Sequence, residues 1–112
     1  MTALIYCPFP DEDSALAIGR TLVDEKLVAC INVGGSMRSI FSWEGTTGEG
    51  LEVAALLKTD SALLARAISR LEALHPYESP AILGWHCDVA AAATQAWLGG
   101  LDPAEQGVVP DE

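Results

Sequence analysis

The chain has 112 residues, of which 50% are hydrophobic and 20% are charged, a composition that predicts one folded domain rather than a disordered segment. Sixteen Asp and Glu residues against six Lys and Arg residues give a net charge of −10, which opposes charge-driven binding to nucleic acid or to anionic membranes. We therefore expect neither nucleic acid nor a membrane as a partner.

The number of cysteines and the length of the apolar runs indicate in which cellular compartment the protein lies. The apolar runs are shorter than the roughly 20 residues that cross a bilayer, and the first ten residues lack the basic start of a secretory signal. Cys7, Cys30 and Cys87 are an odd, scattered set, unlike a disulfide framework. We expect free thiols and a cytoplasmic location.

The first third of the chain predicts a strand and a helix. Residues 3–7 are mostly apolar and are stopped by Pro8 and Pro10, as in a buried strand. Residues 11–14 (Asp-Glu-Asp-Ser) provide capping oxygens, and apolar residues then recur at three- and four-residue spacing up to Val23. An amphipathic helix is expected there.

The middle of the chain predicts two long strands. Residues 29–43 form an extended pattern interrupted by Gly34 and Gly35, where we expect a bulge or bend. The glycine-rich residues 45–50 predict a loop. Residues 51–59 alternate and become apolar on both sides, which is typical of a strand in a sheet that is covered on both faces.

The last third predicts a helix, a strand and a shorter helix. Thr59 or Asp60 can cap a helix that ends before Pro76, and residues 81–89 form a last strand. Asp88 can cap the terminal helix, for which Trp97 and Leu98 are the expected anchors. Residues 102–112 are expected to form an acidic, frayed tail outside the single domain of residues 1–101.

This element order is the pattern of an α+β, ferredoxin-like βαββαβ sandwich with an extra C-terminal helix. Right-handed crossovers give the spatial strand order 4-1-3-2, with strands numbered along the chain. We expect one rim of the sheet to collect several polar or reactive residues. This predicted rim consists of Cys7, Cys30, Asn32, Lys58, Thr59 and residues 75–80.

The hairpin over residues 29–59 predicts self-association. Its arms of about nine or more residues span about 30 Å, whereas the first strand offers only about five residues. The hairpin should therefore overhang its own sheet and expose Phe41 and Trp43 beside unpaired backbone groups. We expect a closed homo-oligomer; the alternative is that the terminal helix folds back over the arm.

Five segments between Ala3 and about Leu101 form a recognisable set. They are Cys7 with Pro10-Asp11-Glu12, Glu25 to Asn32, Ser39 to Gly45, Glu52-Val53 with Lys58-Thr59, and His75 to Pro80. In this order and spacing they resemble the divalent-cation tolerance proteins called CutA. The resemblance implies a PII-like, ferredoxin-like fold and a tight homotrimer joined by the hairpin arms, with Phe41 and Trp43 as contacts. It also implies a small cytoplasmic protein linked to metal tolerance, with copper binding in some members.

The same resemblance implies a metal site formed by Cys7 and His75. Leu74 stands where some relatives have a second histidine, so the implied set here has two ligands. Thiolate and imidazole are ligands that favour copper or zinc. The alternative is that Cys7 is a packed strand thiol and His75 a helix C-terminal residue favoured by the helix dipole. We expect no obligatory cofactor, and copper or another divalent metal as an optional ligand.

The segment from His75 to Pro80 carries the most unusual polar cluster. Tyr77 and Glu78 lie between two prolines, and with Asn32 and Lys58 they suit a cavity between subunits that holds a small anion or another ligand. The alternative is that these side chains only form interface hydrogen bonds and an ion pair.

The motifs of common enzyme classes are missing from the sequence. It contains no GxxxxGK[ST] loop, G-x-S-x-G elbow, H-E-x-x-H pair or C-x-x-C pair. We expect no enzymatic activity. Two kinds of function stay open: a homotrimeric metal-tolerance protein that binds metal, and a PII-like small-ligand sensor or trimeric scaffold that acts through a partner protein.

Overall fold

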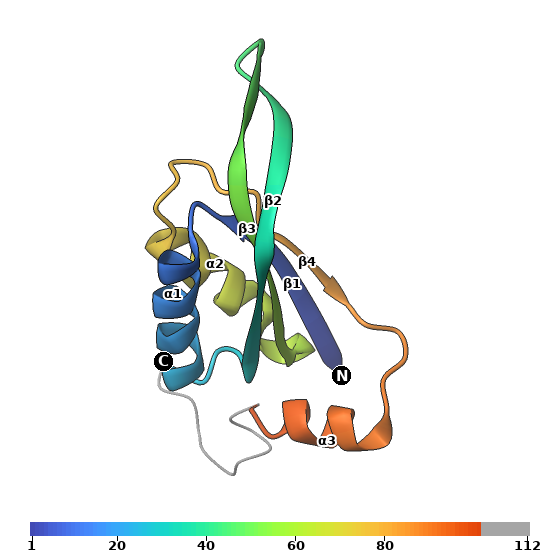
Figure 1. Ribbon diagram of the computed structural model, residues 1–112. Helices are drawn as coiled ribbons and strands as arrows, with labels where there is room; N and C mark the ends of the chain where they lie inside the picture. The colour runs from blue at the N-terminus through green and yellow to red at the C-terminus, as the bar shows by residue number, and fades with distance from the viewer. Residues whose placement is uncertain (102–112) are drawn as a thin grey trace.

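The computed structural model describes residues 1–101 and confirms the α+β architecture (Figure 1). The elements are β1 (Thr2–Phe9), α1 (Glu12–Asp24), β2 (Cys30–Trp43), β3 (Thr46–Asp60), the short 3₁₀ helix η1 (Ser61–Leu63), α2 (Leu64–Leu74), β4 (Leu83–His86) and α3 (Ala92–Gly99). Their order along the chain is the predicted one. The acidic tail predicted for residues 102–112 lies outside the described residues.

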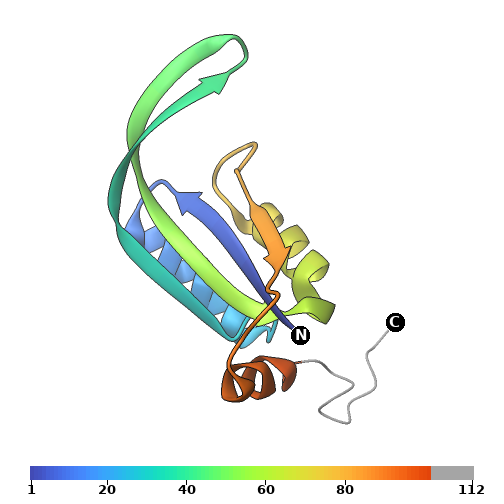
Figure 2. The same cartoon turned by 90° about the vertical axis from the view of Figure 1, so that its right-hand side faces the viewer.

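The four strands form one antiparallel sheet in the order β2-β3-β1-β4, which is the predicted order read from the other edge. Both long helices lie on one face of this sheet, and neither of them covers its other face (Figure 2). The short helix α3 lies at one end of the molecule (Figures 1 and 2). No helix within residues 1–101 is long and apolar enough to cross a membrane.

The core lies between the sheet and the two long helices. Alternate residues of β1, from Ala3 to Phe9, are fully buried, and they pack in one cluster with Leu22 of α1 and Leu71 of α2. Burying one such large apolar side chain contributes about 1.5–3 kcal/mol. The period-two burial of β1 therefore fixes which of its side chains face the helices.

The helix boundaries have identifiable causes. The Asp11 carboxylate accepts a hydrogen bond of 2.7 Å from the Ser14 N–H, so the acidic segment caps α1 as predicted. Asp60 accepts from the Ala62 N–H at 2.9 Å and thus caps η1, which precedes α2. The predicted cap and one predicted anchor of the terminal helix are wrong. Helix α3 begins after Ala91 without a side-chain cap, and Trp97 is 51% exposed, so the fully buried Leu98 anchors this helix.

The predicted loop at residues 45–50 is wrong, because the turn consists only of Glu44 and Gly45. Both residues have positive φ, 50° and 80°, as a tight hairpin turn of the I′ type requires. Gly48 already belongs to β3, opposite Phe41, and a Cβ on Gly48 would overlap the Phe41 ring. The glycine therefore provides space for a ring within a strand instead of forming a loop.

The hairpin extends beyond the rest of its sheet, as predicted. The register of β2 against β3 shifts between Val33 and Ser36, which confirms the predicted bulge. The last residue of β1, Phe9, pairs with Val53, so the part of β3 before Val53 has no β1 neighbour. Figure 1 shows the two arms projecting past the other elements.

The predicted common rim is wrong. Strands β1 and β3 are antiparallel, with Ala3 opposite Thr59 and Cys7 opposite Ala55. Because each connection reverses the chain direction, the start of β2 and the end of β3 lie where β1 begins. Lys58 and Cys30 face each other across these two strands and are therefore remote from the end of β1 that follows Cys7.

Candidate functional site

Cys7 lies near the end of β1 among the buried side chains of the core. Its relative exposure is 0%, and its thiol donates to the Pro8 carbonyl oxygen at 3.5 Å. Burial raises the pKa of the Cys7 thiol to about 12, and the negative charge of Glu52 adds to this effect. Cys7 is therefore a protonated thiol at neutral pH.

His75 ends helix α2 and is held by both ring nitrogens. Its Nδ1 accepts from the Tyr77 N–H at 3.1 Å, and its Nε2 lies 2.8 Å from the Pro8 carbonyl oxygen. A carbonyl oxygen only accepts, so Nε2 carries the proton. The Phe9 ring stacks on the imidazole at 4.8 Å between ring centroids. The segment after α2 thus holds His75 as one defined tautomer against the end of β1.

Cys7 and His75 are brought together, because the thiol and Nε2 both contact the Pro8 carbonyl oxygen. The donor types suit a soft metal ion. However, a metal would have to displace the proton of the thiol, and the Nε2 proton would have to move to Nδ1, which accepts from the Tyr77 N–H. No group of three or more His, Cys, Asp or Glu side chains within residues 1–101 is arranged to hold an ion. The pair alone is a two-ligand site with both donor atoms engaged in hydrogen bonds.

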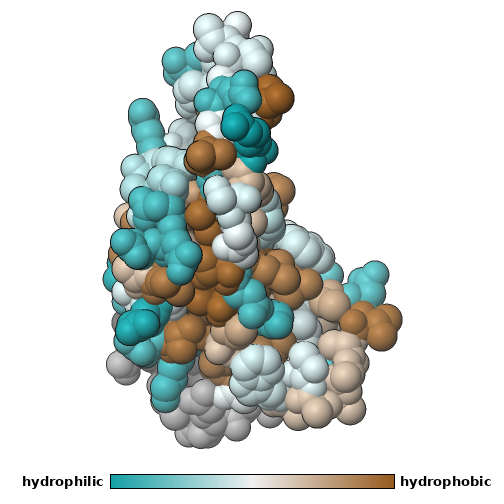
Figure 3. All heavy atoms as spheres, in the orientation of Figure 1, coloured by the Kyte–Doolittle hydropathy of each residue, from teal (hydrophilic) through white to brown (hydrophobic). Residues whose placement is uncertain are grey.

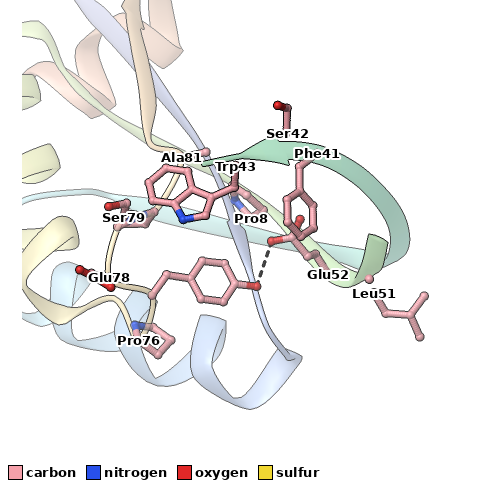
Figure 4. Close-up of a pocket in the computed structure, with 13 residues that line it drawn as sticks. Pro8, Phe41, Ser42, Trp43, Leu51, Glu52, Pro76, Glu78, Ser79 and Ala81 are labelled. Carbon is pink, nitrogen blue, oxygen red and sulfur yellow. Dashed lines mark hydrogen bonds between the residues drawn. The ribbon is translucent and has the colours of Figure 1, made fainter. Parts of the chain in front are cut away.

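A pocket of about 940 Å³ lies beside this pair, between the hairpin and the segment after α2 (Figure 4). We call it the hairpin pocket. It is lined by Pro8, Phe41, Ser42, Trp43, Gly50, Leu51, Glu52, Pro76, Tyr77, Glu78, Ser79, Pro80 and Ala81. In Figure 4 the side chains of Trp43 and Glu52 reach from the hairpin toward the segment that carries Pro76.

One hydrogen bond joins the two sides of the hairpin pocket. The Tyr77 hydroxyl donates to the Glu52 carboxylate at 2.9 Å (dashed line in Figure 4). Burial, followed by this bond and the charge of Glu52, raises the pKa of Tyr77 to about 12. The phenol therefore stays neutral and donates to the Glu52 side chain at the pocket wall.

Two of the four residues predicted for a ligand cavity line the hairpin pocket, namely Tyr77 and Glu78. Asn32 pairs with Leu56, and its side chain accepts from the Cys30 thiol at 3.6 Å. Lys58 lies opposite Leu4, on the sheet face that the helices leave bare. In the single chain these two residues do not join Tyr77 and Glu78, and their part in a cavity between subunits stays a prediction.

Phe41 and Trp43, the predicted trimer contacts, are 49% and 52% exposed on the overhanging arm. Both also line the hairpin pocket. Sequence reasoning missed the role of Glu52 in this pocket. The available signal was its position as a charged residue in a strand that otherwise becomes apolar, but its partner Tyr77 is 25 residues away and is not predictable from spacing.

Comparison with known proteins identifies the family. The family model described as CutA1 divalent ion tolerance protein matches residues 3–100. The divalent-cation tolerance protein CutA of Pyrococcus horikoshii is 38% identical over 95 residues, which cover 85% of this chain and 92% of that protein. The CutA of Thermotoga maritima is 37% identical over 95 residues, covering 85% and 93% of the two chains.

A solved structure gives the same result for the fold. The periplasmic divalent cation tolerance protein CutA of Archaeoglobus fulgidus superposes with a TM-score of 0.84 at 29% identity, covering 90% of this chain and 98% of that one. The family match spans both Cys7 and the segment from His75 to Pro80. The chain therefore belongs to the CutA1 divalent ion tolerance family.

Proposed function

We propose that this chain acts as a cytoplasmic homotrimer in the response to divalent metal ions and binds copper-type ions through Cys7 and His75, in a binding role without catalysis. The observation that supports metal binding is the convergence of the Cys7 thiol and His75 Nε2 on the Pro8 carbonyl oxygen, at 3.5 Å and 2.8 Å. A soft thiol and an imidazole are ligand types that copper-type ions prefer, and their contact with the same carbonyl oxygen supports the proposal.

The geometry also sets the expected strength of binding. A thiol with a pKa of about 12 must release its proton before it can bind a metal. Two protein ligands are fewer than the three or four of tight zinc sites. We therefore expect weak binding whose affinity rises by about tenfold per pH unit between pH 6 and 9.

Competitive titration with copper(I) and with zinc tests the site. The Cys7→Ser and His75→Ala variants should each lose the bound ion. Cys87→Ser is the matched control, since its thiol donates to the Val89 carbonyl oxygen at 3.1 Å and has no part in the proposed pair. Unchanged stoichiometry in both Cys7→Ser and His75→Ala would refute metal binding at this pair.

Exposed apolar residues on the hairpin and the outer edges of the sheet support the proposed homotrimer. Hydrophobic residues are visible on the projecting hairpin as well as at its base (Figure 3), and Ile40 and Leu51 on the arms are 75% and 62% exposed. The outer strands β2 and β4 each have one edge that pairs with no other strand among residues 1–101. They run in opposite directions, so copies placed head to tail continue an antiparallel sheet, and such a heterologous contact can close into a ring. The threefold number is what the CutA resemblance implies.

A reducing compartment is supported by the three cysteines, which are all free. The relative from Archaeoglobus fulgidus is described as periplasmic, which is a different location from the one proposed for this chain. Fractionation of cells that express the untagged protein checks this part, and recovery outside the cytoplasm would contradict it.

A second candidate function is a small-ligand sensor or a trimeric scaffold that acts through a partner protein. The hairpin pocket favours the sensor, because its volume of about 940 Å³ falls in the range of small-molecule sites. Its lining shares Pro8 and Tyr77 with the contacts of His75, because the Tyr77 N–H donates to His75 Nδ1 at 3.1 Å. A ligand in the pocket would therefore lie next to a metal at the pair.

A further inference from the structure

The hydrogen bond between Tyr77 and Glu52 belongs to a chain of contacts that reaches His75. The Tyr77 hydroxyl donates to the Glu52 carboxylate at 2.9 Å (dashed line in Figure 4). The Tyr77 ring lies 4.8 Å from the His75 imidazole between ring centroids, and the Tyr77 N–H donates to His75 Nδ1 at 3.1 Å. One residue thus connects the hairpin with a ring nitrogen of His75.

Tyr77 is the residue that ties the segment after α2 to the hairpin. Its neighbours Pro76 and Glu78 are exposed, whereas Tyr77 and its acceptor Glu52 are half-buried. Among residues 1–101, no other hydrogen bond joins residues 76–81 to β2 or β3. We call the bond between Tyr77 and Glu52 the hairpin latch. It joins two segments of one chain, so it does not require a free surface around it.

The contacts of His75 are the reverse of those of a metal-binding histidine. Nδ1 accepts from the Tyr77 N–H, and Nε2 carries the proton that it donates to the Pro8 carbonyl oxygen at 2.8 Å. A histidine that binds a metal through Nε2 offers a lone pair there, and its Nδ1–H donates to an acceptor. A backbone N–H only donates, so the Tyr77 amide has to leave Nδ1 before Nε2 can act as a ligand.

We propose that Glu52 and Tyr77 are positioning residues, and that the hairpin latch holds His75 in its Nε2–H tautomer and thereby weakens metal binding at the pair. This inference rests on the proposed metal function. Opening the hairpin latch releases the Tyr77 amide from Nδ1, and the ring proton then moves from Nε2 to Nδ1 by exchange with water. Nε2 thus presents a lone pair beside the Cys7 thiol. The hairpin, which carries the proposed subunit contacts, is in this way coupled to the metal pair.

Nuclear magnetic resonance of the metal-free protein tests the first half of the proposal, since the nitrogen shifts of an imidazole report which nitrogen carries the proton. Tyr77→Phe removes the hydroxyl and keeps the ring. At mildly alkaline pH it should raise the ratio of Nδ1–H to Nε2–H tautomer of His75 by about three- to tenfold, as expected for the loss of one hydrogen bond. Tyr6→Phe is the matched control, because it removes a tyrosine hydroxyl that contacts Met37 Sδ at 3.6 Å; it should leave the ratio unchanged.

Variants of Glu52 separate the hydrogen bond from the rest of the side chain. Glu52→Gln keeps an oxygen that accepts from Tyr77 and should retain the wild-type tautomer ratio, whereas Glu52→Leu should shift it as Tyr77→Phe does. Combining Glu52→Leu with Tyr77→Phe should shift the ratio no further, because both substitutions break the same bond. Circular dichroism and native mass spectrometry report folding and assembly of each variant. If Glu52→Leu does not fold, Tyr77→Phe and Tyr6→Phe still decide the question.

Competitive titration with copper(I) tests the second half of the proposal. Tyr77→Phe should bind copper(I) about three- to tenfold more tightly than the wild type, and Tyr6→Phe should match the wild type. An unchanged tautomer ratio in Tyr77→Phe, an equal shift in Tyr6→Phe, or a shift without tighter copper binding would each overturn the proposal. If neither the wild type nor any variant binds copper(I), the proposed metal function is refuted, while the tautomer ratio, measured without metal, decides separately whether the hairpin latch positions His75.

Discussion

The Cys7 thiol shows how burial sets the chemistry of one side chain. A cysteine is chemically a metal ligand or a nucleophile only as its thiolate, and burial keeps this thiol protonated with a pKa of about 12. The residue type that suggests a copper site is thus the same residue that completes the core between β1 and the helices. Which role dominates depends on the free energy of removing the proton.

The raised pKa of Cys7 predicts a loss of stability at alkaline pH. A thiol has a pKa of about 8.5 in the unfolded chain, so its contribution is fully present below that pH and is lost as the pH rises toward 12. Urea unfolding at one protein concentration between pH 8 and 11 should show the wild type losing stability faster than Cys7→Ala, by at most about 1.4 kcal/mol per pH unit. Cys30→Ala, which removes a half-buried thiol, should follow the wild type. Parallel curves for wild type and Cys7→Ala would contradict the assignment.

The hairpin of β2 and β3 shows how a pattern of glycines can mislead. Gly45, Gly48 and Gly50 are close together in sequence and predict a loop, but each has a different reason in the structure. Gly45 has a φ of 80°, Gly48 lies against the Phe41 ring, and a Cβ on Gly50 would meet nothing within 4 Å. The element is therefore longer, and its turn tighter, than sequence reasoning predicts.

This difference predicts unequal effects of the same substitution. Gly45→Ala should destabilise the hairpin by about 1 kcal/mol, because an L-residue pays for a left-handed backbone. Gly50→Ala should be neutral or slightly stabilising, since nothing occupies the space of its Cβ and alanine has less backbone entropy to lose. Thermal unfolding and amide exchange of the hairpin measure both variants. Equal destabilisation by the two would show that the turn is not where the structure has it.

The whole molecule has a hairpin that its own sheet and helices do not cover. Helices α1 and α2 lie on one face of the sheet (Figure 2), although residues 51–59 predict apolar contacts on both. The half-buried Leu56 and the exposed Leu83 and Trp85 lie on elements of this sheet. The apolar residues on both sides of this strand predict that both faces of the sheet are covered. Helices α1 and α2 cover only one face, which supports the proposed assembly.

The proposed homotrimer can be tested by its mass and by dilution. Native mass spectrometry should give three chains, and the melting temperature should fall on dilution because association is coupled to folding. Phe41→Glu or Trp43→Glu should weaken assembly, whereas Val89→Glu, at an 86% exposed position outside the strands, should not. A wild-type mass of one chain, or equal weakening by all three variants, would rule out the proposed contacts.

The sequence alone was sufficient for the order of the elements, the sheet order, the overhanging hairpin and the family, because these depend on local periodicity, chain direction and short motifs. It was not sufficient for the rim. Placing Lys58 with Cys7 overlooked the antiparallel direction of β3, which sets Lys58 opposite Leu4. The hairpin pocket was decided only by tertiary structure, because the bond from Tyr77 to Glu52 joins segments that no spacing rule connects. The packing of α2 against the end of β1 likewise placed both nitrogens of His75 in hydrogen bonds, a state that burial and backbone geometry determine and composition does not.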